Sequence, residues 1–271
     1  MVFTAHSIRF VPKVTAAAFF DLDRTLISGA SIFPFAVEAW RAGLVKNADI
    51  ARFATGALAF LAFGDKGDKS EGTRAAILGH VKGVSVDVLG EVAARVLPRL
   101  SDRVRPESRR LVKMHHEAGR ETWIVSASPY GIVAPLATTL GMTGAIATKG
   151  RVVDGYFTDE LDGPFVYGQG KVEAIQQLAD ERGYDLAASY AYSDSISDLP
   201  MLEAVGHPVA VNPDRDLERI AHDRGWPVVI FARKTKRAIA LGLGTSAAGG
   251  LALGTYALGR YQGRLAERTR R

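Results

Sequence analysis

The chain has 271 residues, of which 47% are apolar and 23% are charged, and this suits one large globular domain or a domain with an insertion. It has no cysteine, which excludes disulfide bridges, zinc–thiolate sites and cysteine nucleophiles. The net charge of +5 is uneven, because residues 232–271 hold nine Lys or Arg and one acid, so that the first 231 residues carry −3. We therefore expect no nucleic-acid partner for the main body of the protein.

The first predicted strand covers residues 15–20, an apolar run that ends abruptly at Asp21 and Asp23. Side chains two residues apart in an extended chain point the same way, so these two carboxylates can share one side. Two carboxylates held close do not both ionise cheaply, and either one pKa rises or a cation joins them. The pattern thus offers a nucleophile, an acid and half of a metal site. A strand followed by an Asx turn would show the same residues.

A helical block follows from residue 31 to residue 105, and no strand pattern interrupts it. Apolar periodicity and turn residues predict its helices at 32–43, 50–63, 73–82 and 86–97. We interpret the block as a helical cap inserted after the first strand. The apolar helix at 50–63 is too short to span a bilayer, so we expect it to form the core of the cap, with an apolar substrate pocket as the alternative.

The remainder of the body alternates between strands and helices. We predict strands at 122–125, 144–148, 189–192 and 209–211, a hairpin at 152–157, and helices at 106–119, 130–140, 168–182, 199–205 and 214–224. This order is typical of an α/β fold with a five-stranded parallel sheet and right-handed crossovers. The predicted domains are a catalytic core of residues 1–30 and 106–232, a cap of residues 31–105 and a tail of residues 233–271.

Polar residues follow the predicted strands or open a helix at four places, which are Asp21/Asp23, Ser126, Lys171 and Asp194/Asp198. Ligands of open α/β sheets bind outside the carboxyl ends of the strands, so we expect these residues to meet. Carboxylates, a cation, a hydroxyl and a glycine-flanked helix start suit phosphoryl transfer. A phosphate beside carboxylates is repelled by about 4 kcal/mol per charge pair at roughly 4 Å, which one lysine does not offset. A divalent cation is needed, and oxygen ligands favour Mg²⁺.

Each of these residues also has a plainer interpretation when it is taken alone. Ser126 could cap a turn, and Lys171 could be a solvated residue in the first turn of its helix. Asp198 could cap the helix that begins at Leu199. Only their order along the chain favours the catalytic interpretation.

Four motifs carry a family resemblance, which are Phe-Phe-Asp21-Leu-Asp23-Arg-Thr25, Ile-Val-Ser126-Ala-Ser, Gly-Gln-Gly-Lys171 and Tyr-Ser-Asp194-Ser-Ile-Ser-Asp198. In this order they resemble the haloacid dehalogenase (HAD) superfamily of hydrolases, specifically its phosphoserine-phosphatase-like branch, subfamily IB. The resemblance spans roughly residues 15–231. It implies a HAD-like Rossmannoid core sheet of five parallel strands with the helical cap inserted after the first.

The resemblance also implies an activity, that of a Mg²⁺-dependent phosphatase acting on a small phosphomonoester. Asp21 would attack phosphorus and form an aspartyl-phosphate, while Asp23 would protonate the leaving alcohol and then deprotonate water. The metal would be held by the carboxylates of Asp21 and Asp194 and the backbone carbonyl of Asp23. Ser126 and Lys171 would contact the transferred phosphoryl group, Thr25 and Ala127 would line the substrate site, and Asp198 would hold Lys171 or a metal-bound water.

The sequence departs from phosphoserine phosphatases at two positions. Ala30 stands where those enzymes carry a glutamate for the substrate's amine, and Ser197 stands where they usually have asparagine. The cap arginine that grips the substrate carboxylate corresponds to Arg74 in a loose alignment. The resemblance therefore implies the chemistry but not phosphoserine as the substrate.

Residues 238–259 form an uncharged segment of 22 residues with basic residues on both sides. We predict a helix there, either as a membrane anchor or as a surface-packed helix, since its six glycines make insertion marginal. The first 14 residues lack an apolar signal segment, so we expect a cytoplasmic protein. Two alternative functions stay open, which are a lipid-phosphate phosphatase at the membrane and a catalytically weak regulatory HAD protein.

Overall fold

The computed structural model describes residues 15–44 and 82–231. The chain divides into two compact units, 1–231 and 232–271, and all described residues belong to the first. The predicted helix at 50–63, most of the helix at 73–82, Arg74 and the C-terminal segment 238–259 lie outside the described residues. Within the described ranges no helix is both long and apolar enough to cross a membrane. The expected cytoplasmic location and the membrane association of the tail stay predictions.

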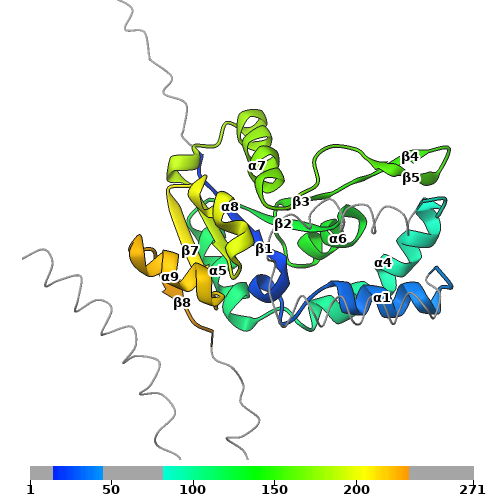
Figure 1. Ribbon diagram of the computed structural model, residues 1–271, viewed down its shortest axis with the longest axis horizontal. Coiled ribbons are helices and arrows are strands. Elements are labelled where there is room, and N and C mark those ends of the chain that lie inside the picture. The colour runs from blue at the N-terminus through cyan, green and yellow to red at the C-terminus, as the bar shows by residue number, and fades with distance from the viewer. Residues whose placement is uncertain (1–14, 45–81, 232–271) are drawn as a thin grey trace, which may run out of the picture. The chain divides into compact units, whose positions relative to one another are not determined.

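A parallel sheet of six strands, in the order β3-β2-β1-β6-β7-β8, forms the centre of the fold (Figure 1). The strands are β1 (Ala17–Asp21), β2 (Glu121–Pro129), β3 (Gly144–Thr148), β6 (Tyr190–Ser193), β7 (His207–Val211) and β8 (Val228–Val229). The predicted α/β class with a parallel core sheet is confirmed. The sheet has one strand more than predicted. The additional strand, β8, is only two residues long, which is too short for a recognisable sequence pattern, and it is defined by its pairing with β7.

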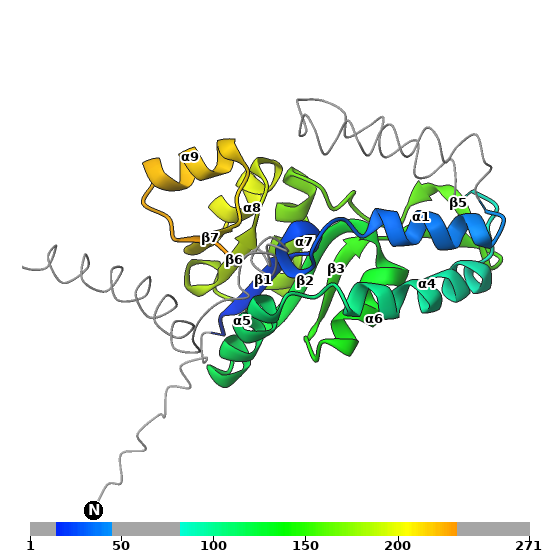
Figure 2. The ribbon, with the colours of Figure 1, turned by 90° about the horizontal axis from the view of Figure 1, so that it is seen from below.

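Helices cover both faces of this sheet (Figure 2). One face packs against α5 (Pro106–Glu117) and α6 (Tyr130–Thr139), and the other packs against α7 (Gln169–Arg182), α8 (Leu199–Glu203) and α9 (Arg215–Asp223). The central strand β1 contributes side chains to the hydrophobic cores on both faces of the sheet. Ala18 and Phe20 pack in the core with α5 and α6, and Ala17 and Phe19 pack in the core with α7, α8 and α9. All five residues of β1 are buried, which explains its continuous apolar run and leaves its last residue, Asp21, at the carboxyl edge.

Two described helices of the predicted cap, α1 (Ile32–Arg41) and α4 (Val86–Ser101), pack against each other, and α4 also packs on α6. Ser85 caps α4 by accepting a hydrogen bond from the N–H of Val88 (3.3 Å). Buried residues of α4 share one hydrophobic cluster with residues of β1 and β2. The cap boundaries at residues 31 and 105 stay a prediction.

A hairpin of β4 (Gly150–Val153) and β5 (Tyr156–Leu161) reaches from the core to the start of α4 (Figure 1). Backbone hydrogen bonds of 2.8 Å from Gly83 to Phe157 and of 2.9 Å from Val86 to Gly155 hold its tip against the segment before α4. Asp154 and Gly155 both have positive φ, as the Asp-Gly dipeptide predicts for a tight hairpin turn.

Candidate active site

The loop after β1 places the first motif. It covers Leu22–Leu26 and is closed by the N–H of Ile27, which donates to the carbonyl of Leu22 (3.0 Å). Arg24 adopts a φ of 62°, the left-handed region that side chains other than glycine seldom occupy. Asp21 is buried at the end of the strand, and Asp23 follows it in a half-buried position.

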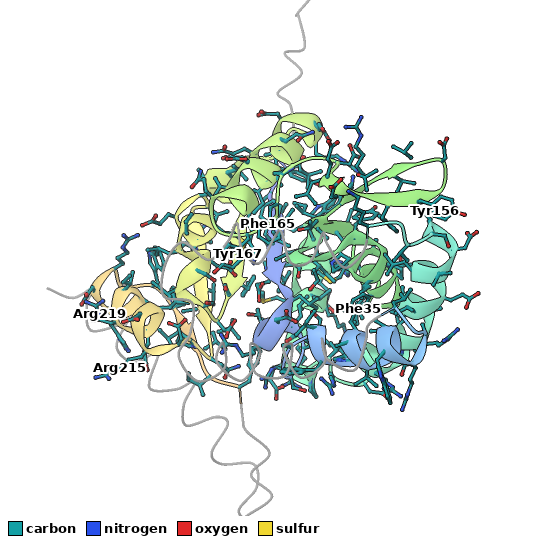
Figure 3. The ribbon with its side chains drawn as sticks, turned by 45° about the vertical axis from the view of Figure 1, so that its right-hand side comes forward. Phe35, Tyr156, Phe165, Tyr167, Arg215 and Arg219 are labelled. Atoms are coloured by element: carbon teal, nitrogen blue, oxygen red, sulfur yellow. The ribbon has the colours of Figure 1, made fainter. Side chains whose placement is uncertain are left out.

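Two glycines shape the backbone that leads into Lys171. Gly168 has a φ of 51°, and a Cβ on Gly170 would lie 2.0 Å from the carbonyl oxygen of Phe165. Glycine is therefore required at both positions by conformation or by close approach. Figure 3 shows Phe165 and Tyr167 in this loop, where their rings stack with centroids 6.0 Å apart. The tight turn starts α7 at the point that puts Lys171 in the first helical turn.

Lys171 is a buried cation held by two carboxylates. It is 2% exposed, and its Nζ lies 2.7 Å from Oδ1 of Asp21 and 2.8 Å from Oδ2 of Asp198. Asp198 Oδ2 also accepts a hydrogen bond from Oγ of Ser193 (2.6 Å), and its side chain does not cap α8. The plainer interpretations of a solvated lysine and a helix-capping aspartate are therefore wrong.

Two residues of the loop after β1 contact the carboxylate of Asp194. Its Oδ2 lies 2.8 Å from Nε of Arg24, and Oγ1 of Thr25 donates to its Oδ1 at 3.4 Å. Its backbone carbonyl accepts from the N–H of Asp214 (2.7 Å), whose side chain also caps α9. The same Asp214 side chain accepts from the N–H of Ile196 (2.8 Å), which fixes the loop that carries Asp194.

A chain of serines connects Asp23 to the second motif. Ser31 donates to the Asp23 carboxylate twice, from its N–H to Oδ1 (2.7 Å) and from its hydroxyl to Oδ2 (3.1 Å). The Ser31 hydroxyl also lies 2.8 Å from the hydroxyl of Ser128. The N–H of Ser128 donates to the buried Oγ of Ser126 (3.1 Å), the local turn contact that the plainer interpretation predicts. Both carboxylate oxygens of Asp23 are thus held from the start of α1.

Burial dominates the electrostatics of the site. It raises the pKa of Asp21 well above the usual value, against the effect of Lys171 and with the help of neighbouring carboxylates. Burial also raises the pKa of Asp23, which the hydrogen bonds from Ser31 oppose, and it raises the pKa of Asp194 to about 7, which Arg24 opposes. Burial alone would lower the pKa of Lys171, but the carboxylates of Asp198 and Asp21 hold that pKa above its usual value.

The donor set fits a hard divalent cation. Four carboxylates, Asp21, Asp23, Asp194 and Asp198, interact here with two contacting cations, Lys171 and Arg24. The cluster therefore lacks positive charge, and all of its donors are oxygens, as Mg²⁺ prefers. No group of three or more acidic or histidine side chains placed to hold a metal occurs in residues 15–44 and 82–231. The predicted set needs only two carboxylates and one main-chain carbonyl.

Comparison with known proteins assigns the family. The sequence model of the haloacid dehalogenase-like hydrolases matches residues 18–203. The chain belongs to this family. The predicted family, fold class and enzyme class, a HAD-type phosphoric monoester hydrolase, are confirmed.

Three similar proteins each align with most of the chain. An inhibition of morphological differentiation protein of Streptomyces azureus is 42% identical over 222 residues, which are 81% of this chain and 80% of that protein. A phosphoserine phosphatase of Mycobacterium tuberculosis is 37% identical over 243 residues, 88% of this chain and 79% of that protein. A solved Bordetella pertussis protein of unknown function, 29% identical, matches with a TM-score of 0.69 and covers 80% of this chain and 98% of its own.

The structure of this hydrolase brings Asp21, Lys171 and Asp198 into direct contact, and it joins Thr25 to Asp194. Ala127 lies half-buried in the irregular end of β2, beside Ser126. Arg74 lies outside the described residues.

Four residues of the site escaped sequence reasoning, which are Arg24, Ser31, Ser193 and Asp214. Arg24 and Ser193 lie inside the quoted motifs, and this position could have marked them as site residues. Asp214 was predictable as a helix cap but not as the anchor of another loop, because its partner Ile196 is brought to it only by the fold.

Proposed function

We propose that this hydrolase is a Mg²⁺-dependent phosphatase that cleaves a small phosphomonoester through an aspartyl-phosphate on Asp21. The observation that carries the proposal is the buried ion pair of Lys171 with Asp21 and Asp198, at 2.7 and 2.8 Å. A buried lysine beside a strand-end carboxylate lowers the pKa of that carboxylate against the effect of burial, and it can neutralise charge on a phosphoryl group.

In the proposed first step a carboxylate oxygen of Asp21 forms a bond to phosphorus while the bond from phosphorus to the ester oxygen breaks. The leaving oxygen takes a proton from the Asp23 carboxyl, and burial raises the pKa of this group in the direction that favours the protonated form. In the second step water attacks phosphorus, Asp23 takes the proton from the water, and inorganic phosphate leaves Asp21 free. The two hydrogen bonds from Ser31 hold the Asp23 carboxyl in place through both steps.

Mg²⁺, when bound, would supply positive charge to the phosphoryl oxygens. The carboxylates of Asp21 and Asp194 and the main-chain carbonyl of Asp23 would hold it, as the charge shortage of the cluster favours. Asp198 positions Lys171, supported by the hydrogen bond from Ser193. Ser126 contacts the phosphoryl group, and Thr25, Ala127 and Arg74 stay proposed substrate residues.

The proposed cap, residues 31–105, contributes substrate selection. Among the described cap residues, Glu38 is the buried carboxylate, and Nη1 of Arg41 (2.7 Å) and Nη1 of Arg99 (3.0 Å) already contact it. It is therefore not available to a substrate ammonium. Since Ala30 also offers no carboxylate, we propose that phosphoserine is a poor substrate.

The test is phosphate release by purified protein from a panel of phosphomonoesters. The panel contains phosphoserine, a sugar phosphate, a nucleoside monophosphate, an aryl phosphate and a lysophospholipid phosphate. We expect release from at least one ester with Mg²⁺, its loss in excess chelator and its recovery when Mg²⁺ is restored. No release from any ester would favour the regulatory alternative, and full activity in excess chelator would contradict the metal site.

A further inference from the structure

The positively charged side chain of Arg24 contacts Asp194, one of the proposed metal ligands. Its Nε lies 2.8 Å from Oδ2 of Asp194, whose side chain is 6% exposed, while the Arg24 side chain is 35% exposed. A buried carboxylate without a positive partner is costly, so this contact stabilises Asp194 where no metal is bound. The guanidinium is permanently charged and cannot relieve the contact by losing a proton.

The backbone holds Arg24 in this place. The residue lies between Asp23 and Thr25 in the loop after β1, its φ is 62°, and its N–H donates to the carbonyl of Gly29 (3.0 Å). An unusual φ in a residue other than glycine persists only where the surrounding structure enforces it. Because that loop also supplies Asp23 and Thr25 to the site, the position of Arg24 is tied to the same framework.

A metal ion bound to Asp194 would put a second positive charge beside Arg24 at the same carboxylate. Asp194 is the proposed metal ligand contributed by the segment after β6, and within the described residues its second oxygen, Oδ1, accepts only a long hydrogen bond of 3.4 Å from Thr25. A divalent cation on this carboxylate would repel the guanidinium at its Oδ2. The exposed third of the Arg24 side chain gives it a direction in which to withdraw.

We propose that Arg24 is an internal counter-cation that competes with the divalent metal for Asp194. It pairs with Asp194 in the metal-free protein and leaves the carboxylate when the metal binds, and so it sets the metal affinity. The inference rests on the metal site of the proposed function. It assigns Arg24 a positioning role through Asp194, not a contact with the reacting atoms.

The experiment measures Mg²⁺ binding by titration calorimetry and thermal melting of the full chain, with Arg24→Met against the unmodified protein. We expect Arg24→Met to bind Mg²⁺ with a Kd on the order of tenfold lower, because a competing charge is removed. In chelator the variant should melt at a lower temperature, because Asp194 has lost its partner, and the difference should close at saturating Mg²⁺. Arg24→Gln, which keeps a hydrogen-bond donor, should show the same changes with the same sign if Arg24→Met does not fold.

Arg224→Met is the matched control, since Arg224 also pairs with one carboxylate, that of Glu203, but on the protein surface. This control should leave the Kd for Mg²⁺ unchanged. If the unmodified protein binds Mg²⁺ and neither Arg24 variant binds it more tightly, the competition is wrong while the proposed function stands. If neither the unmodified protein nor any variant binds Mg²⁺, the metal site of the proposed function is wrong and the inference falls with it.

Discussion

Burial and the charge of Lys171 have opposite effects on the pKa of Asp21. Burial raises its pKa, and Lys171 at 2.7 Å lowers it. A carboxylate in this state combines low hydration with a fixed counter-charge, which suits a nucleophile. The same pairing means that removing the charge of Asp21 leaves Lys171 with Asp198, so the ion pair is not lost completely.

We predict that Asp21→Asn abolishes phosphatase activity and leaves the fold intact. The change is nearly isosteric, but it removes the nucleophile and a proposed metal ligand, and we expect kcat to fall by at least about 10⁴-fold. Circular dichroism and phosphate release check the two halves of this prediction. Asp159→Asn is the matched control, because Asp159 is an exposed residue of β5 that pairs with Lys82. Substantial activity in Asp21→Asn would contradict the assigned nucleophile.

The absence of a carboxylate at Ala30 affects the substrate specificity that we predict. An ammonium group without a carboxylate partner loses a charged hydrogen bond of about 1.5–3 kcal/mol, which is roughly one to two powers of ten in discrimination. We expect phosphoserine to be a poor substrate and Ala30→Glu to raise its kcat/KM relative to other esters. Ala30→Gln, of similar shape without the charge, is the control and should not do so. The prediction is wrong if the unmodified protein prefers phosphoserine by tenfold or more.

At the scale of elements, the turn before α7 decides where Lys171 lies. The helix begins at Gln169, and the carbonyl of Phe165 approaches Gly170 too closely for any side chain. A strand edge collects the carboxylates, and this helix start brings Lys171 to them. A small change of backbone here therefore moves a catalytic group without touching the carboxylates.

We predict that Gly170→Ala lowers kcat on the order of a hundredfold and lowers the free energy of unfolding by about 1–3 kcal/mol. The added Cβ would lie 2.0 Å from the carbonyl oxygen of Phe165, so the turn must shift and take Lys171 with it. Steady-state kinetics and denaturant unfolding measure the two effects. Gly90→Ala in α4 is the control, because no atom of the described residues lies within 4 Å of its Cβ position and activity should not change. Normal values of kcat and stability in Gly170→Ala would show that the turn tolerates a side chain.

At the scale of the whole molecule, His115 joins three elements on one face of the sheet. From α5 it lies 2.7 Å from the Tyr192 hydroxyl of β6, and its ring packs edge-on against Phe20 of β1. The Nε of Arg120 donates to its Nδ1 (2.7 Å), so the ring is neutral with its proton on Nε2. Protonation at Nδ1 would break that hydrogen bond and place two like charges together.

This arrangement predicts a loss of stability in acid. Burial, followed by Arg120 and His116, lowers the pKa of His115 to about 4. The unfolded chain, with a histidine pKa of about 6.5, takes up the proton first, so the contribution is complete above that value and is lost as the pH falls toward 4. The melting temperature of the unmodified protein should exceed that of His115→Gln at pH 7.5, and the difference should shrink by pH 4.5.

His222→Gln is the control for this titration, because His222 lies exposed on α9. Its difference from the unmodified protein should change little over the same pH range. A constant difference for His115→Gln would mean that His115 does not titrate with unfolding.

The sequence by itself determined the elements and the motifs. A run of apolar residues that ends in charge is a local signal, and it located β1 and Asp21; the proline at the start and the glycine at the end located α5 in the same way. The order of the four motifs also predicted that Asp21, Lys171 and Asp198 would meet, because parallel strands share their carboxyl edge. Helix and strand ends differ from the predictions by a few residues, since neighbours in space decide where the last turn or pair forms.

Only the tertiary structure decided which groups pair. Lys171 and Asp21 are 150 residues apart. The resemblance implied that Asp198 holds Lys171 or a metal-bound water, but no local pattern chooses between these roles and the capping of α8. The pairing of Arg24 with Asp194, the enclosure of Glu38 by two arginines and the strand β8 likewise depend on strand order and packing. The physical reason is that a buried charge is stabilised by whichever opposite charge the fold brings within contact distance, and that distance is independent of separation along the chain.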